Sequence, residues 1–171
     1  GAKFQLNKNH GLPLKIVGSK NLKPIYFNEN KGSAQCKSAV IFGGLRTKGK
    51  TLIKAKKSRD HTEILCKHLN LPVKVKNKKK FDLIEINKAK IIKPINYNIP
   101  SDISSAAFFL VLTVLTRKSE LVIKNVNINP SRVGVITILK KMGVKIKFLN
   151  KKIYKGEKIA DIKVNSPKTL K

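Results

Sequence analysis

The chain has few of the residues on which several protein classes depend, and each shortage narrows what it can be. It carries only two cysteines, with no His or Cys at metal-ligand spacing around them, which excludes a disulfide framework and a thiolate metal site. It has no Trp and only 6% aromatic residues, so few side chains could stack on nucleic-acid bases. Its longest apolar runs span about a dozen residues, too short to cross a bilayer.

The two cysteines, Cys36 and Cys66, both fall within segments that we expect to be helical. In an open, lysine-rich chain such cysteines indicate buried, reduced thiols and therefore a cytoplasmic protein. The sequence starts at Gly1 rather than at Met, and it shows no signal peptide. We expect it to be a piece of a longer protein.

Acidic residues are scarce: nine stand against 38 Lys and Arg, which gives a net charge of +29. Such a charge normally indicates a nucleic acid or an anionic membrane as partner. However, only four of the basic residues are Arg, and Lys, Asn and Ile are abundant together, as in proteins from A/T-rich genomes. We therefore interpret the lysines as a solvated basic surface and expect neither nucleic acid nor a membrane as a partner.

What the chain does have is a regular succession of strands and helices. Apolar spacing and capping residues predict helices over residues 33–45, 59–69, 102–115 and 131–142. Strands are expected at residues 51–55, 72–76, 81–87, 120–125, 144–149, 152–154 and 161–164, with two short ones within 12–27 and an extended stretch at 90–97. The first and third helices are apolar nearly all round, which predicts burial on most sides, whereas the other two are amphipathic.

This succession repeats. Residues 58–76 align with residues 131–149, with Ser58 on Ser131 and Arg59 on Arg132, at an offset of 73 residues. Each copy is expected to run strand, helix, strand, helix, strand, strand. Mixed elements at so long a period indicate stacked βαβαββ units of the α/β class rather than a short-repeat solenoid. The break between the copies falls near the Pro-containing stretch at residues 97–100.

Two predicted helix starts combine hydroxyl groups with unpaired backbone amides, which is a natural place to hold a phosphate or a carboxylate. At the first start, Ser33 could donate its hydroxyl to an anion, and Gln35 could donate to a second anion or hydroxyl nearby. In purely structural terms, Ser33 is a helix N-cap and Gln35 faces solvent. Local sequence leaves both interpretations open.

The second helix start carries Ser58, Arg59 and His61. Because Lys is the default cation of this chain, an Arg beside a capping Ser suggests a fork of donors that Lys could not supply. Alternatively, Arg59 is exposed and pairs with Asp60 or Glu63. His61 could be a general base, could lie at the edge of the same pocket, or could be an ordinary first-turn residue with neither role.

A later copy of these features is a weaker candidate site. We expect Asp102 to cap the third helix, with Ser104 and Ser105 in its first turn, although all three could present polar groups to a ligand. Ser131 and Arg132 mirror the Ser-Arg pair of the first copy and are either a second site or inherited scaffold. The chain shows no paired carboxylates at catalytic spacing, no Ser-His-Asp set and no Gly-rich phosphate loop.

Several blocks of the sequence resemble one known family. They are GSAQCKSAVIFGGL at residues 32–45, SRDHTEILCKHL at 58–69, IPSDISSAAFFLVLTVL at 99–115, INPSRVGVITILKKMG at 128–143 and GEKIADIKV at 156–164. Together they are similar to the middle of bacterial 5-enolpyruvylshikimate-3-phosphate (EPSP) synthases of the SAQ type. The similarity runs in order from residue 11 to residue 164.

The resemblance implies a fold of two domains, each with three βαβαββ units around inward-pointing helices, the inside-out barrel of enolpyruvyl transferases. On that basis residues 1–98 are the last unit of the N-terminal domain with its preceding strands. Residues 99–171 are then the first unit of the C-terminal domain. With the barrel incomplete, helices that belong at its centre would be exposed.

The resemblance also implies an activity, that of 3-phosphoshikimate 1-carboxyvinyltransferase. This cytoplasmic enzyme of chorismate and aromatic amino-acid biosynthesis (the shikimate pathway) transfers enolpyruvyl from phosphoenolpyruvate to the 5-hydroxyl of shikimate 3-phosphate and releases phosphate. The family uses no metal and no organic cofactor. We expect two small-molecule substrates, no nucleic-acid or membrane partner, and a monomer at full length.

The resemblance assigns substrate contacts to residues at both helix starts. The residues implied for shikimate 3-phosphate are Ser33, Ala34, Gln35, Ser58, Arg59 and His61, and Gln35 is also implied for phosphoenolpyruvate. The family's Lys-containing phosphate site, its Asn-Ala-Gly-Thr loop, its proton-transfer acid and its Lys-Glu-Thr-Asp-Arg segment have no counterpart in these 171 residues. We therefore expect no catalytic residue among them.

Two alternatives remain at this stage. One is the related transferase that acts on UDP-N-acetylglucosamine, for which we would expect a Cys-containing catalytic loop and no SRDHTE segment. The other is a non-enzymatic basic binding module, such as an RNA-binding domain, whose affinity would be high and would fall steeply with salt.

We predict that a polypeptide of these 171 residues alone forms no EPSP, because the groups that the family uses for chemistry are missing from it. The measurement is product formation by the purified chain with shikimate 3-phosphate and phosphoenolpyruvate. Measurable turnover would contradict the prediction.

Overall fold

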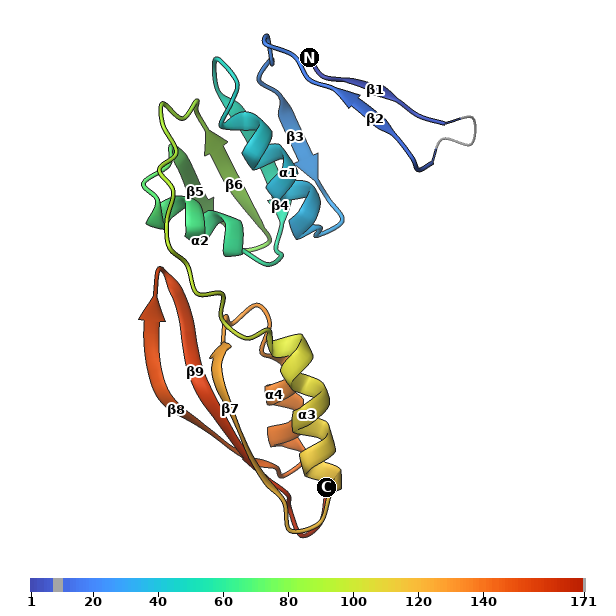
Figure 1. Cartoon of the computed structure of the whole chain (residues 1–171), viewed down its shortest axis with the longest axis vertical. Helices are drawn as coiled ribbons and strands as arrows, with labels where there is room; N and C mark the ends of the chain where they lie inside the picture. The colour runs from blue at the N-terminus through green and yellow to red at the C-terminus, as the bar shows by residue number, and fades with distance from the viewer. Residues whose placement is uncertain (8–10, 171) are drawn as a thin grey trace. The chain divides into compact units, whose positions relative to one another are not determined.

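The computed structural model describes residues 1–7 and 11–170, and the chain divides into two compact units (Figure 1). Gly1–Ser58 and Leu69–Lys93 make up the first unit. Arg59–His68 and Pro94–Lys171 make up the second. Each unit contains one sheet of three or four strands, and the first also contains a separate two-stranded ribbon.

The first unit is built on a four-stranded sheet in the order β3-β4-β6-β5. β3 and β4 are parallel, whereas β6 is antiparallel to both of its neighbours. The strands of this unit are β1 (Lys3–Gln5), β2 (Lys15–Val17), β3 (Tyr26–Glu29), β4 (Thr51–Lys56), β5 (Val73–Asn77) and β6 (Phe81–Ile86). β1 and β2 pair only with each other, as an antiparallel ribbon, and all six of their residues are exposed.

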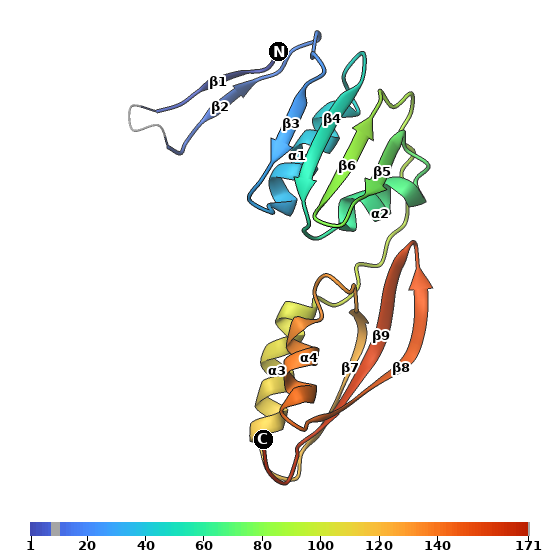
Figure 2. The same cartoon turned by 180° about the vertical axis from the view of Figure 1, so that it is seen from behind.

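Helix α1 (Ala34–Gly44) connects the parallel strands β3 and β4 and covers one face of the sheet (Figures 1 and 2). A connection between parallel strands needs such a crossover, and a helix supplies it. Ile41 of α1 and Ile53 of β4 are fully buried in the resulting core. Gly44 lets α1 lie close to β6, because a Cβ added at this position would lie 3.0 Å from the Ile86 side chain.

The second unit has a three-stranded antiparallel sheet in the order β7-β9-β8, with two helices on one face (Figure 2). Its elements are α2 (His61–His68), α3 (Ile103–Leu115), β7 (Glu120–Asn127), α4 (Gly134–Lys141), β8 (Lys145–Tyr154) and β9 (Glu157–Asn165). Its core joins the inner side of α3 and α4 to the sheet, through Ile103, Leu110, Leu139, Val126 and Ile162.

The predicted repeat is present in the order and pairing of the strands. β3-α1-β4-α2-β5-β6 is the first copy of the βαβαββ repeat. The second copy runs α3-β7-α4-β8-β9, and a parallel bridge from Ser101 to Val126 takes the place of its first strand. The two sheet orders correspond strand by strand. α4 begins and ends 73 residues after α2, which is the offset seen in the sequence. The α/β fold class with repeated βαβαββ units is therefore confirmed.

Asp161 holds two irregular points of the second sheet together. The pairing of β7 with β9 slips at Asn125, and that of β8 with β9 slips at Asn150, both of which have positive φ. Asp161 on β9 accepts from the Asn125 backbone N–H at 2.8 Å and from Asn150 Nδ2 at 2.8 Å. These two hydrogen bonds, with Lys124, lower the pKa of Asp161 to about 2, against the opposing effect of burial.

Two predicted helix starts are wrong. Ser58 does not cap α2, because the helix begins at His61 and its first turn closes with the bond from Ile64 N to the Asp60 carbonyl. Ser131 does not begin α4, because Asn129 binds it in a turn and the helix begins at Gly134.

Other boundaries also differ from expectation. The two strands expected at residues 144–149 and 152–154 form one bulged strand, β8, which begins at Lys145, and the extended stretch at residues 90–97 is not paired into a sheet. Cys66 is buried as expected, but Cys36 is exposed, so its predicted burial is wrong. Both cysteines are free thiols.

The helices that are apolar all round are buried on one side only. On α3, Phe108, Phe109 and Leu112 are 78%, 59% and 61% exposed, and on α1 Phe42 is 54% exposed. Exposed apolar faces of this kind are typical of surfaces that pack against other apolar surface. Among the described residues, no helix has the length and apolar character needed to cross a membrane.

We predict that a polypeptide of these 171 residues self-associates, because the exposed faces of α1 and α3 favour burial against another copy. Sedimentation velocity of the purified chain should show a mass that grows with concentration. Replacing Phe108 and Leu112 by Gln should shift the distribution toward monomer. Ile153→Gln is the control, because Ile153 is similarly exposed (73%) but lies on β8, and it should change the distribution little. A sharp, concentration-independent monomer would contradict this prediction.

Candidate functional site

The residues predicted to bind an anion in the first unit follow the carboxyl ends of two neighbouring strands. β3 and β4 are parallel and pair Glu29 with Ala55, so the loops that leave them start at the same edge of the sheet. Ser33 ends the first loop and Ser58 lies in the second. The two loops are close: a Cβ added to Gly32, at φ +79°, would lie 3.6 Å from the Lys57 carbonyl oxygen. Ligands of open α/β sheets bind at such an edge.

Glu29, the last residue of β3, fixes the loop before α1. It is 4% exposed, and its carboxylate accepts from the backbone N–H groups of Lys31 (3.0 Å), Gly32 (2.9 Å) and Ser33 (3.0 Å). Burial alone would raise the pKa of Glu29, but these three bonds and the charge of Lys37 hold it below its usual value. Glu29 is therefore an ionised anchor for the start of α1.

Lys37 lies one turn into α1 and is only 1% exposed. A buried ammonium requires a nearby negative charge, and Glu29 provides it, because Lys37 contributes to lowering the pKa of that carboxyl. This internal compensation matters for ligand binding. Without it, the Glu29 carboxylate would repel an anion at the helix start.

The start of α1 presents several hydrogen-bond donors. Ser33 is the N-cap, and its Oγ accepts from Cys36 N at 3.2 Å. The first bond of the helix runs from Lys37 N to the Ser33 carbonyl at 3.1 Å, so the amides of Ala34 and Gln35 precede the regular helix bonds. Gln35 is exposed. The structural reading of Ser33 as a cap is confirmed, and its hydroxyl hydrogen remains available for an anion.

Ser58 follows β4, three residues before α2. Its Oγ is buried and has no hydrogen-bond partner among the described residues. A buried hydroxyl without a partner is uncommon in folded proteins and requires an explanation. An external ligand that reaches this hydroxyl would supply one.

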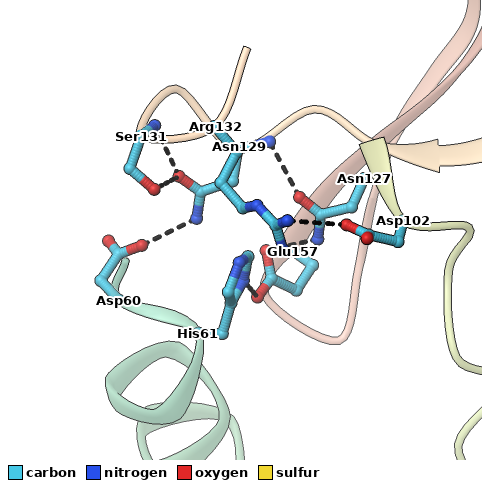
Figure 3. A network of polar contacts seen from close by, with 8 residues as sticks. All are labelled: Asp60, His61, Asp102, Asn127, Asn129, Ser131, Arg132 and Glu157. Carbon is cyan, nitrogen blue, oxygen red and sulfur yellow. Dashed lines mark hydrogen bonds and ion pairs between the residues drawn. The ribbon is translucent and has the colours of Figure 1, made fainter. Parts of the chain in front are cut away.

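Arg59 and His61 belong to the second unit. Arg59 is half-buried. His61 Nδ1 lies 2.6 Å from Glu157 Oε1, whereas its Nε2 is buried without a partner among the described residues (Figure 3). His61 is thus held by a buried carboxylate of the same unit.

The second copy of the predicted site is satisfied internally. Asp102 caps α3 by accepting from Ser104 N at 3.3 Å, and it pairs with Arg132 at 2.8 Å (Figure 3). Arg132 also donates to Ser104 Oγ at 2.6 Å, and Ser131 donates from Oγ to Asn129 at 2.7 Å. These residues have the structural roles that the sequence left open, and Ser105 is exposed in the first turn of α3.

Sequence reasoning missed the carboxylates and amides that support the site, namely Glu29, Asn129 and Glu157. One signal could have found the carboxylates. Acidic residues are scarce in this chain, as Arg is, so each acid, like each Arg, was a candidate for a specific structural or binding role. Five of the nine acidic residues are buried: Glu29, Glu63, Asp82, Glu157 and Asp161.

Comparison with known proteins decides the family. The sequence profile of the family described as EPSP synthase (3-phosphoshikimate 1-carboxyvinyltransferase) matches residues 1–170. The chain belongs to the EPSP synthase family. Enzymes named 3-phosphoshikimate 1-carboxyvinyltransferase from Caldicellulosiruptor bescii and Petrotoga mobilis are 45% and 37% identical to it, each over 168 residues or 97% of the chain.

Solved structures agree with this assignment. An EPSP synthase from Acinetobacter baumannii matches all of the chain with a TM-score of 0.83 and 37% identity, over 38% of its own length. The enolpyruvyl transferase NikO from Streptomyces tendae matches with a TM-score of 0.67 over 41% of its length, and at 14% identity it supports the fold alone. The chain covers 39% of the Caldicellulosiruptor enzyme, so it spans about two-fifths of the EPSP synthases that it matches.

We predict that Glu29→Gln destabilises the first unit by about 2 kcal/mol at pH 7, because an amide cannot accept all three backbone N–H bonds. The pKa of Glu29 is lowered on folding, so its stabilising effect is fully present above the unfolded value of 4.5 and is lost as the pH falls through the folded value. The urea midpoints of variant and wild type should therefore converge as the pH is lowered below 4.5.

Glu120→Gln is the matched control, because Glu120 is an exposed carboxylate paired with Lys163 on the other sheet. It should change the urea midpoint little at any pH. Equal midpoints of Glu29→Gln and wild type at pH 7 would contradict the anchoring role.

Proposed function

We propose that this chain is part of an enzyme that transfers the enolpyruvyl group of phosphoenolpyruvate to the 5-hydroxyl of shikimate 3-phosphate. In that reaction an ether bond to the enolpyruvyl carbon forms and the bond from that carbon to the phosphate oxygen breaks, releasing inorganic phosphate. The observation that carries the proposal is the family match over residues 1–170. The geometry at the carboxyl edge of the first sheet supports it, because both substrates are anions.

Within this proposal, the start of α1 binds the phosphate of shikimate 3-phosphate. Ser33 donates its hydroxyl, and Ala34 lends its backbone N–H from the first turn of α1. The positive end of the helix dipole adds to these donors. Gln35, exposed in the same turn, contacts both substrates near the reacting atoms.

The segment before α2 binds the other polar groups of shikimate 3-phosphate. Ser58 is a candidate because its buried hydroxyl has no partner among the described residues. Arg59 adds a planar fork of donors that suits a carboxylate or phosphate. His61 lies beside the ring of the substrate.

The wider assignment is proposed as well. Residues 1–98 belong to the N-terminal domain of the enzyme and residues 99–171 to its C-terminal domain. The enzyme is a cytoplasmic monomer of the shikimate pathway that acts on small molecules, without a metal, an organic cofactor, a nucleic acid or a membrane as partner.

The direct test is product formation by the enzyme encoded by the complete coding sequence that contains these residues. Formation of EPSP and phosphate from phosphoenolpyruvate and shikimate 3-phosphate supports the proposal. Turnover with UDP-N-acetylglucosamine in place of shikimate 3-phosphate, or tight, steeply salt-dependent binding to RNA without turnover, would overturn it.

We predict that Ser33→Asp raises the KM for shikimate 3-phosphate about a hundredfold or more in that enzyme. Asp caps a helix as well as Ser does but brings a negative charge to the anion site. The thermal midpoint should therefore stay close to that of wild type. Ser33→Thr, which keeps both the cap and the hydroxyl, is the matched control. Its KM for shikimate 3-phosphate should stay within about threefold of the wild-type value. An unchanged KM in Ser33→Asp would remove Ser33 from the phosphate site.

A further inference from the structure

Glu157 binds His61, which is the first residue of α2 and lies two positions after Arg59. Glu157 lies at the start of β9 and is 5% exposed. Its Oε1 accepts from His61 Nδ1 at 2.6 Å, and its Oε2 accepts from Asn127 Nδ2 at 3.0 Å (Figure 3). Both carboxylate oxygens of Glu157 are thus engaged, one of them by His61, and the imidazole ring is held in position.

Asn129 binds Asp60, the residue between Arg59 and His61. Asn129 is 4% exposed, and its Nδ2 donates to Asp60 Oδ1 at 2.7 Å. Its Oδ1 accepts from both the backbone N–H (2.9 Å) and the hydroxyl (2.7 Å) of Ser131. A backbone N–H can only donate, so Ser131 fixes which end of the Asn129 amide faces Asp60.

The turn between β8 and β9 packs against the same helix. Gly156 has φ +89°, and a Cβ added to it would lie 2.8 Å from the Ile64 side chain. The turn therefore lies flat on α2 only because residue 156 is glycine. Polar anchors at the first turn and this apolar contact one turn later hold α2 at two levels.

We propose that Asn129 and Glu157 are positioning residues for shikimate 3-phosphate: they fix Asp60 and His61 and thereby hold the adjacent Arg59 ready for the substrate. This inference rests on the proposed function. Two consecutive side chains directly after Arg59 are bound by buried partners, which leaves its backbone few conformations. A donor that is ordered before binding costs less entropy when the substrate arrives.

The test swaps the two side chains of the contact between Asn129 and Asp60, in the enzyme encoded by the complete coding sequence. Asn129→Asp alone sets two carboxylates against each other, and the KM for shikimate 3-phosphate should rise about tenfold, with kcat and the KM for phosphoenolpyruvate within about twofold. Adding Asp60→Asn restores the contact with its direction reversed. The carboxylate introduced at position 129 can accept from Ser131 with one oxygen and from the new amide at position 60 with the other. The double variant should therefore return to within about twofold of wild type.

Two further variants sharpen the result. Glu157→Gln, which turns an amide toward Asn127, should raise the same KM severalfold. Glu120→Gln removes a carboxylate from the exposed pair with Lys163 and should leave all constants unchanged. Hydrogen exchange of the amides of residues 59–62 should quicken in Asn129→Asp and slow again in the double variant.

The outcomes separate the two proposals. An active wild type whose KM for shikimate 3-phosphate is the same in Asn129→Asp and Glu157→Gln overturns the positioning role and leaves the proposed function standing. A general loss of kcat and thermal midpoint that the double variant does not restore also overturns it, since that pattern reflects folding. A wild type without turnover of shikimate 3-phosphate overturns the proposed function itself, and the positioning role with it.

Discussion

The start of α1 depends on one buried carboxylate, that of Glu29. Three successive backbone N–H groups, of Lys31, Gly32 and Ser33, point at this carboxylate and would otherwise lie unpaired beside the sheet. Since Glu29 is itself the last residue of β3, it ties the loop to a strand that is paired along its whole length with β4. The position of the helix N-terminus, and so of any anion that it binds, is set by the sheet rather than by a flexible loop.

The same device recurs in the second unit. Asp161 closes two bulges across its sheet, and Glu157 joins α2 to β9. A buried carboxylate that accepts several N–H bonds contributes to the stability of the fold, whereas an exposed one contributes little. Several of the nine acids lie where the backbone departs from regular structure, and the described lysines other than Lys37 are exposed or half-buried.

The sequence was sufficient for those parts of the fold that local chemistry decides. α1 and α3 begin where Ser33 and Asp102 cap them, and the repeat offset of 73 residues reappears in α2 and α4. It failed at Ser58 and Ser131, which look like caps but are not. The hydroxyl of Ser131 is bound by Asn129, and His61 is held by Glu157, 96 residues away. The turn from Asn129 to Ser131 is local and could have been predicted from the sequence, whereas no local pattern indicates a partner 96 residues away such as Glu157.

The two repeats differ in how the start of their apolar helix is capped. In the second copy the cap of the apolar helix is Asp102, and its carboxylate pairs at 2.8 Å with Arg132, the arginine of that copy's Ser-Arg pair. The negative charge that this helix start favours is thus part of the chain. In the first copy the cap is Ser33, which is neutral, and the nearby Glu29 is already occupied by three amides and the charge of Lys37. On the proposed function, the neutral cap leaves donors of α1 for an anionic substrate, whereas the start of α3 already carries its own ion pair.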